Sequence, residues 1–186
     1  MTVSPPVPMA IEQFDQAGLP DTYELHGGKP VEMTLARPAH RETQWQICRV
    51  LEQLFKDASV RIEMTFQVAA TNDKRSADVG VTSADRWQAA LEETALTGAP
   101  EIVVEVLSPS NSVLELQAYQ SLCLDFGTEV FLIVNPDART VEVRRKGSRM
   151  AEIWGVSEEF ALELWGERHV IEVRDLFAGL PEKRSS

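Results

Sequence analysis

IVVEVL, residues 102–107, is the stretch that decides the fold, because it is almost entirely β-branched and aliphatic. Such a run predicts a central strand that is buried on both faces. Glu105 stands in the middle of it, and stranding an ion in an apolar interior costs several kcal/mol or more. Its carboxylate must therefore be neutralised, paired or bound to a metal. A Ser-Pro-Ser turn follows at residues 108–110.

The segments around this strand predict a mixed β-sheet flanked by helices, with β-hairpins near both ends of the chain. Apolar residues at helical spacing predict helices at residues 11–16, 39–58, 112–126 and 175–180, and a weaker one at 84–96. Alternating or continuous apolar runs predict a strand with a Gly-Gly turn over residues 23–28, its hairpin partner at 31–35, strands at 60–68, 78–82, 131–134, 141–145 and 151–154, and a hairpin over 160–173. The strand–helix–strand crossover over residues 101–134 favours locally parallel pairing.

A chain of 186 residues fits one domain with a core of its own. We expect a Pro-rich extended arm at residues 1–9, a single domain at 10–180 and a frayed tail at 181–186. Cys48 and Cys123 belong to no CxxC or Cys/His spacing, so they are expected to be buried thiols rather than zinc ligands. Free thiols, no leader pattern and no run of about 20 apolar residues together predict a cytoplasmic protein without a membrane span.

The formal net charge of −11 bears on the class of partner. Proteins that bind DNA tightly through bulk electrostatics usually have a basic surface, so an acidic chain needs a local basic face to bind it. The densest basic clusters are Lys74-Arg75 and the run Arg144-Arg145-Lys146 with Arg149. A solvated hairpin edge is the ordinary alternative for such a run.

Asp78 is the second carboxylate that stands out, because it opens the predicted strand at residues 78–82. Two carboxylates on strand edges of one core, with a Ser-Pro turn beside Glu105, indicate a divalent-metal site for phosphodiester chemistry. A strand-initial Asp that caps a turn, and a salt-bridged core Glu, are the alternatives. Glu63, on the polar face of its strand, is expected to be a cross-strand partner.

Three segments together resemble one known family. They read YELHGGKPVEM at 23–33 with PAH at 38–40, RSADVGV at 75–81, and PEIVVEVLSPSNS at 100–112, with Gly127 and VFLIVNP at 130–136 after the helix. Over residues 10–178 this pattern is similar to the Uma family of putative restriction endonucleases, within the PD-(D/E)XK nuclease superfamily. The resemblance implies a restriction-endonuclease-like fold of the α+β or α/β class and a metal-dependent DNA endonuclease.

The resemblance also implies site residues. Asp78 matches the metal-binding Asp of the superfamily and Glu105 the acid of its (D/E)xK element. With the main-chain carbonyl of Val106 they would hold Mg²⁺ or Mn²⁺ through hard oxygen ligands. Glu24 and His40 match further polar positions: Glu24 as an additional acidic ligand, His40 as a phosphate contact or proton shuttle. An exposed hairpin Glu and a solvated His at a helix start are the alternatives.

The lysine of the superfamily element is missing, since its position is Leu107. Members of the family often carry the lysine on the following helix, eight residues before the glycine that ends it, and this chain has Tyr119 at that position. Gln120 is a polar neighbour of that position, and Tyr119 on an apolar stripe has core packing as its ordinary role. A cation from elsewhere, such as Lys56, Lys74 or Arg75, is the other source of positive charge.

Two other functions stay open at this point. One is a non-catalytic protein that keeps the fold as a binding or interaction module, which the missing lysine and the acidic charge favour. The other is a metal-dependent hydrolase of a different substrate. A homodimer is expected by analogy with nucleases that cut two strands. Trp87 is a candidate for base stacking, with covering the sheet edge as the preferred alternative.

Overall fold

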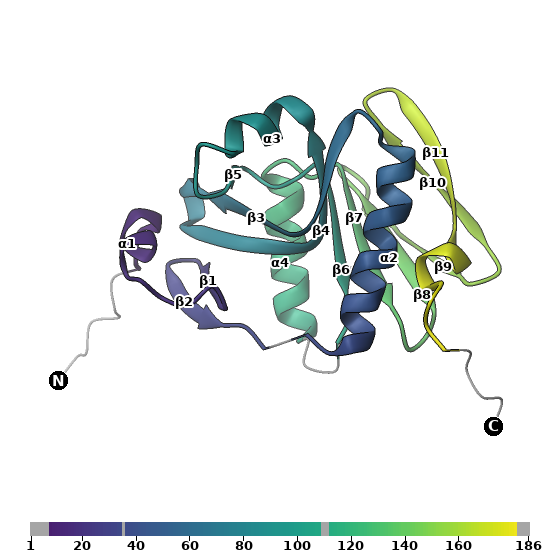
Figure 1. Ribbon diagram of the computed structural model, residues 1–186, viewed down its shortest axis with the longest axis horizontal. Helices are drawn as coiled ribbons and strands as arrows, with labels where there is room; N and C mark the ends of the chain where they lie inside the picture. Colours follow the sequence, from purple (N-terminus) through teal and green to yellow (C-terminus); the bar gives the residue numbers. More distant parts are fainter. Residues whose placement is uncertain (1–7, 35, 109–111, 182–186) are drawn as a thin grey trace.

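The computed structural model describes residues 8–34, 36–108 and 112–181 (Figure 1). Most of the expected Pro-rich arm, the expected tail from residue 182 and residues 109–111 of the Ser-Pro-Ser turn lie outside the described residues. The helices are α1 (Ile11–Gln16), α2 (Pro38–Leu54), α3 (Ala84–Ala90) and α4 (Val113–Asp125), with 3₁₀ turns η1 (Ala69–Thr71) and η2 (Val173–Phe177). The strands are β1 (Tyr23–His26), β2 (Lys29–Glu32), β3 (Ala58–Val68), β4 (Asp73–Ser83), β5 (Leu96–Thr97), β6 (Ile102–Val106), β7 (Val130–Asn135), β8 (Thr140–Arg145), β9 (Ala151–Gly155), β10 (Glu159–Leu164) and β11 (Glu167–Glu172).

One large sheet, mostly antiparallel, organises the chain. Its strand order is β2-β1-β4-β6-β7-β8-β9, and β3 pairs with both β4 and β5, while β10 and β11 form a separate hairpin. The crossover predicted over residues 101–134 is confirmed, because β6 and β7 are parallel and α4 connects them. The predicted mixed sheet flanked by helices is therefore confirmed.

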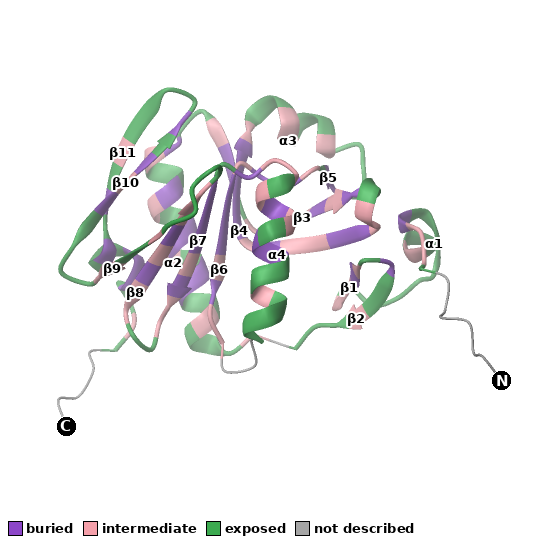
Figure 2. Cartoon of the chain, turned by 180° about the vertical axis from the view of Figure 1, so that it is seen from behind, coloured by how far each residue is buried: buried purple, intermediate pink, exposed green. Residues whose placement is uncertain are grey.

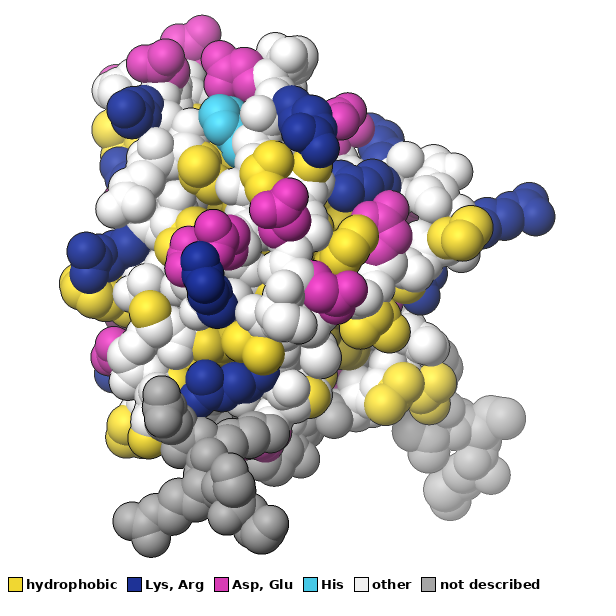
Figure 3. All heavy atoms as spheres, turned by 90° about the vertical axis from the view of Figure 1, so that its right-hand side faces the viewer, with side chains coloured by type: hydrophobic (Ala, Val, Ile, Leu, Met, Phe, Trp, Pro, Cys, Tyr) yellow, Lys and Arg dark blue, Asp and Glu magenta, His cyan; other side chains and the backbone are white. Residues whose placement is uncertain are grey.

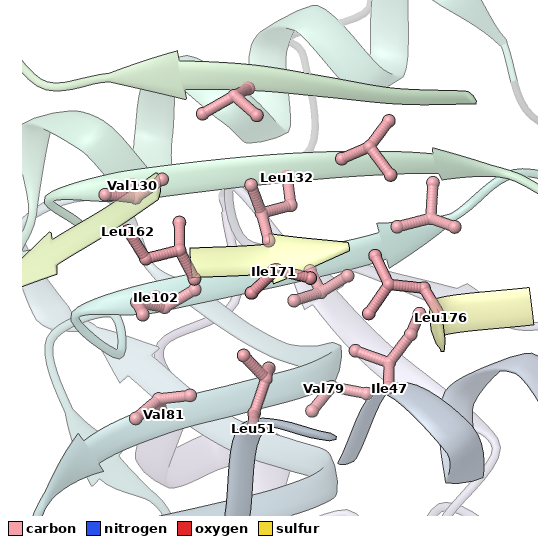
Figure 4. Close-up of a cluster of buried hydrophobic side chains, with 14 of the residues drawn as sticks. Ile47, Leu51, Val79, Val81, Ile102, Val130, Leu132, Leu162, Ile171 and Leu176 are labelled. Carbon is pink, nitrogen blue, oxygen red and sulfur yellow. The ribbon is translucent and has the colours of Figure 1, made fainter. Parts of the chain in front are cut away.

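The sheet lies between two helical layers. Figures 1 and 2 show α2 on one side of β6 and β7 and α4 on the other, with the outer surface of α4 exposed. Alternate residues of β6 divide accordingly: Ile102 packs with α2, the β10–β11 hairpin and η2 (Figure 4), as does Val104, whereas Val103 packs with α4. A run of six apolar-rich residues with both faces covered leaves Glu105 half-buried between buried neighbours.

Several element boundaries differ from the predicted ones for tertiary reasons. β4 begins at Asp73 rather than Asp78, because β3 pairs with it from Asp73 to Ala77 and again from Val79 to Ser83, so Asp78 is central in the strand. β2 begins at Lys29, where it completes the hairpin register with β1. The weak helix ends at Ala90, and Leu96–Thr97 instead joins β3 in parallel.

Gly127 ends α4 as predicted. Its φ of +136° lies in the region that L side chains rarely adopt, and a Cβ there would stand 2.7 Å from the Ala99 carbonyl oxygen. This close approach, with the Ala99 N–H donating to the Phe126 carbonyl, joins the end of α4 to the segment that leads into β6. The glycine thereby sets where β6 begins relative to the helix.

The remaining predictions about the chain concern its surface and its thiols. Cys48 and Cys123 are free and buried, as expected. Within the described residues no helix is both long and apolar enough to cross a membrane. On the face at the right of Figure 1, acidic, basic and apolar side chains are interspersed, so the described part of that face presents no large field of one sign (Figure 3).

Candidate functional site

Asp78 and Glu105 meet where the ladder between β4 and β6 stops. The last backbone pair is Val79 with Val104. Beyond it the Asp78 N–H donates to Glu105 Oε1 at 3.3 Å, and the Val106 N–H donates to Asp78 Oδ2 at 2.6 Å. Side-chain carboxylates thus replace carbonyl groups as acceptors, and the two acids are held next to each other by the sheet itself.

The two carboxylates destabilise each other when both are charged. Burial raises the pKa of Glu105 well above its ordinary value, and the negative charge of Asp78 raises that pKa further. The N–H of Asp78 and the positive charge of Arg75 oppose the rise without cancelling it. A pair of this kind gains stability from a proton or from a cation placed between the two carboxylates.

The first half of α2 supports Asp78 from the other side. His40 Nε2 donates to Asp78 Oδ1 at 3.1 Å, and Gln44 Nε2 donates to the same oxygen at 2.8 Å. The spacing of four residues places both side chains on one face of the helix. Within the described residues His40 Nδ1 is buried without a hydrogen-bond partner, so only the Nε2 atom of this ring is hydrogen-bonded there.

The charge state of His40 depends on these neighbours. Burial lowers its pKa, but the hydrogen bond to Asp78 and the charges of Asp78 and Glu63 outweigh burial and raise the pKa above its ordinary value. His40 therefore carries a proton over more of the neutral range than a free histidine does.

Glu63 is a member of the site that its sequence pattern did not reveal. It lies on β3 where the pairing with β4 is interrupted at Asp78, and its φ of 52° is a left-handed conformation that costs a non-glycine residue about 1 kcal/mol or more. Its Oε1 accepts from Gln44 Nε2 at 2.9 Å, so Gln44 bridges Glu63 and Asp78. Burial raises the pKa of Glu63, with Gln44 opposing the rise and Asp78 adding to it.

Glu24 is close to the site but already has a full set of partners. Its Oε2 accepts from Arg75 Nε at 2.9 Å and from His26 Nε2 at 2.8 Å, and its Oε1 accepts from the Ser76 N–H at 3.0 Å. Burial raises its pKa, but the hydrogen bond from His26 and the charge of Arg75 prevail and lower it overall. This carboxylate is an anchor for Arg75.

Arg75 brings a positive charge to the site. Its guanidinium carbon lies 4.4 Å from the centre of the Tyr119 ring, and its charge lowers the pKa of both Glu24 and Glu105. Arg75, which is ion-paired with Glu24 and Asp73, is thus a cation from elsewhere in the chain whose charge acts on Glu105.

Tyr119 and Gln120, the positions on α4, are both buried. The Tyr119 ring stacks with Phe66 and meets Phe131 edge-on, and its hydroxyl donates to the Ser76 carbonyl at 3.3 Å. Burial raises the pKa of this phenol well above its ordinary value, so it stays protonated. Gln120 Nε2 has no hydrogen-bond partner among the described residues.

The donor set bears on the identity of any metal. Carboxylate and carbonyl oxygens suit Mg²⁺ and Mn²⁺, whereas zinc prefers thiolate and imidazole ligands. Burial raises the pKa of the Cys48 thiol to about 11 and that of Cys123 higher still, which disfavours thiolate ligation. Within the described residues no three His, Cys, Asp or Glu side chains converge as a metal cluster. Asp78 and Glu105 therefore fit a hard cation that completes its shell with backbone oxygen, water or substrate.

The pH dependence of stability follows from Glu105. Because its pKa is raised above 4.5 in the folded state, the unfolded chain loses that proton first as pH rises. Metal-free protein should therefore lose stability from about pH 4.5 up through the raised pKa, and Glu105→Gln should be more stable than the wild type at pH 8. Urea denaturation with a chelator at pH 5 and pH 8 measures this gain. A gain that is equal at both pH values would show that ionisation of Glu105 is not its cause.

The comparisons with known proteins bear on the fold and on the family of the chain. A crystal structure titled as a putative nuclease belonging to DUF820 from Anabaena variabilis ATCC 29413 superimposes with a TM-score of 0.77 at 22% identity, covering 92% of this chain and 98% of that one. At that identity the likeness shows the fold. No curated protein matches the chain. The model of the Uma2 family, described as putative restriction endonucleases, matches residues 11–165, and the chain belongs to that family.

Proposed function

We propose that this protein is a metal-dependent DNA endonuclease of the PD-(D/E)XK type. Asp78 and Glu105, with the main-chain carbonyl of Val106, are the proposed ligands of Mg²⁺ or Mn²⁺. One observation carries the proposal. Where β4 and β6 separate, the Asp78 and Val106 N–H groups donate to the carboxylates of Glu105 and Asp78 instead of to backbone carbonyl groups. This arrangement brings two acids together, and their mutual repulsion and burial destabilise the fold. Costs of this kind concentrate at functional sites.

The residues around the proposed metal site have different roles. When bound, a divalent ion supplies a Lewis acid for the scissile phosphate and lowers the pKa of a water. His40 and Gln44 hydrogen-bond Asp78 and fix its orientation, as residues that hydrogen-bond a metal ligand do in metal sites. The protonated form of His40, favoured by its raised pKa, is suited to contact a phosphate oxygen.

Arg75 is proposed to supply the positive charge that the lysine supplies elsewhere in the superfamily. It is fixed by Glu24 and by the Tyr119 ring, so it needs no reorganisation to face an anion. Tyr119 is then the platform under Arg75 rather than a catalytic phenol. A direct role for Gln120 in catalysis and a homodimeric assembly both stay predictions.

Calorimetry with Mn²⁺ tests the metal site. We expect wild-type protein to bind Mn²⁺ and Glu105→Gln to bind it at least about tenfold more weakly. Loss of a residue that only hydrogen-bonds a metal ligand already lowers metal affinity about 10–100-fold. Glu129→Gln is the matched control, since Glu129 is half-exposed and paired with Lys146. Absence of binding by the wild type up to millimolar Mn²⁺ would refute the proposal and favour a non-catalytic binding protein of the same fold.

A further inference from the structure

A row of arginines runs along the exposed side of α2, next to the proposed metal site. Arg37 caps the helix, and Arg41, Trp45 and Arg49 follow at steps of four residues, all of them exposed. Residues four apart lie side by side on a helix, so these side chains form one ridge. At 1.5 Å per residue the ridge is about 18 Å long, or about five steps of B-DNA at 3.4 Å each.

The arginines of this ridge are not neutralised. Within the described residues none of them forms an ion pair, whereas the basic clusters at 74–75 and 144–146 are paired with carboxylates. Glu42, also on α2, points toward Gly179 at the end of the chain, and Glu52 lies in the last turn of the helix. In a protein with a net charge of −11, unpaired arginines in a row are a local basic surface.

Arg61 extends the basic surface from the ridge onto β3. It stacks on a tryptophan, as Arg49 does on the ridge. The Arg49 guanidinium lies 4.7 Å from the Trp45 ring centre, and that of Arg61 lies 5.2 Å from the Trp87 ring centre. The strand that carries Arg61, β3, packs against α2. The exposed Trp45 ring, next to a guanidinium, is suited to stack with an unpaired base, whereas Trp87 is half-buried and packs against the core on the α4 side of the sheet.

The surface leads to the site. Arg41 directly follows His40 on α2, and His40 hydrogen-bonds Asp78. Arg61 and Glu63 lie on the same strand, and Glu63 is bridged to Asp78 by Gln44. A phosphate chain that follows the ridge toward the start of α2 therefore arrives at His40 and Asp78.

We propose that the ridge formed by Arg37, Arg41, Trp45 and Arg49, extended by Arg61, binds a single-stranded stretch of DNA and leads one phosphate to Asp78 and Glu105. The arginines pair with successive phosphates and Trp45 stacks on a base. This inference rests on the proposed function, since it assigns the substrate of that site as DNA with unpaired bases.

Fluorescence anisotropy of a labelled single strand of about 20 nucleotides and its duplex, in a chelator so that no cleavage occurs, tests the ridge. Arg41→Ala/Arg49→Ala should weaken binding and reduce the slope of log affinity against log salt by about 1.4, or about 0.7 per lost phosphate contact on a single strand. Arg149→Ala/Arg168→Ala makes the same change in net charge at exposed arginines outside α2 and should leave the slope unchanged. Equal effects of the two double variants would overturn the ridge.

Trp45→Ala is expected to weaken single-strand binding about tenfold, the loss typical of one stacked base, and duplex binding much less. Trp165→Ala is the matched control, because Trp165 is 50% exposed and Trp45 is 49% exposed. Equal affinity of the wild type for single strand and duplex would overturn the stacking.

Cleavage of the same labelled single strand by the wild type, measured in parallel with Mn²⁺ in place of the chelator, separates the two proposals. Ridge-dependent binding without cleavage supports the ridge and counts against the nuclease. Cleavage with binding that the ridge variants do not alter overturns the ridge alone.

Discussion

Asp78→Asn is expected to reduce Mn²⁺-dependent cleavage of supercoiled plasmid by at least about 10³-fold. A divalent ion contributes several kcal/mol to stabilising the charge that develops on phosphate, and about 4 kcal/mol corresponds to about 10³ in rate. The substitution removes the negative charge from the centre of the site. It also places an amide where the Val106 N–H and the two donors of α2 now meet a carboxylate.

The measurement is the rate of nicking and linearisation with time at saturating Mn²⁺. Asp125→Asn is the matched control, because Asp125 is exposed at the end of α4. Thermal denaturation of both variants shows whether they are folded. If Asp78→Asn kept its activity within about tenfold of the wild type, any cleavage would come from another site. Cleavage by the wild type would also separate a nuclease from a metal-dependent hydrolase of some other substrate.

Much of the fold follows from local sequence, because its central elements are continuous apolar runs with clear ends. β6, β7 and α4 lie where the sequence predicts them, and Gly127 ends the helix for the steric reason expected. The boundary of β4 could not be predicted in this way. Its charged first residues pair with β3 across the sheet, so its start depends on a partner strand rather than on its own pattern.

The candidate site also contains residues that the sequence singles out and residues that it does not. Asp78 and Glu105 stand out as isolated acids in apolar strands, and the structure brings them into contact. Gln44 and Glu63 carry no such signal, since a Gln on an amphipathic helix and a Glu on the polar face of a strand are ordinary. The spacing of His40 and Gln44, four residues apart on a helix, is the one trace that points to a shared partner.

The pattern of basic residues along the chain is less informative, because the density of Lys and Arg in the sequence does not show which of them pair with carboxylates in the fold. Both basic clusters that stand out in the sequence pair with carboxylates of other segments. The unpaired arginines of α2 are four residues apart and form a surface only once the segment is a helix. Helical periodicity applied to charged residues as well as apolar ones would have revealed them.

Arg75→Ala is expected to lower cleavage by about 10²–10³-fold, the cost of removing one fixed donor that stabilises transition-state charge. Because Arg75 is not a proposed ligand, Mn²⁺ binding should persist in the variant, which separates it from Asp78→Asn. Arg75→Lys should recover only part of the loss, since an ammonium keeps the charge but not the planar group that stacks on Tyr119 and pairs with Glu24 through Nε.

The substitution of Arg75 also leaves the half-buried Glu24 with fewer partners, which destabilises the protein for a reason unrelated to catalysis. The double variant Arg75→Gln/Glu24→Gln removes both charges and is the matched control for that effect. If the charge of Arg75 acts on the phosphate, the double variant is as slow as Arg75→Ala although its stability is restored. If the double variant regains wild-type cleavage, Arg75 serves only to neutralise Glu24, and the positive charge at the site must come from another side chain.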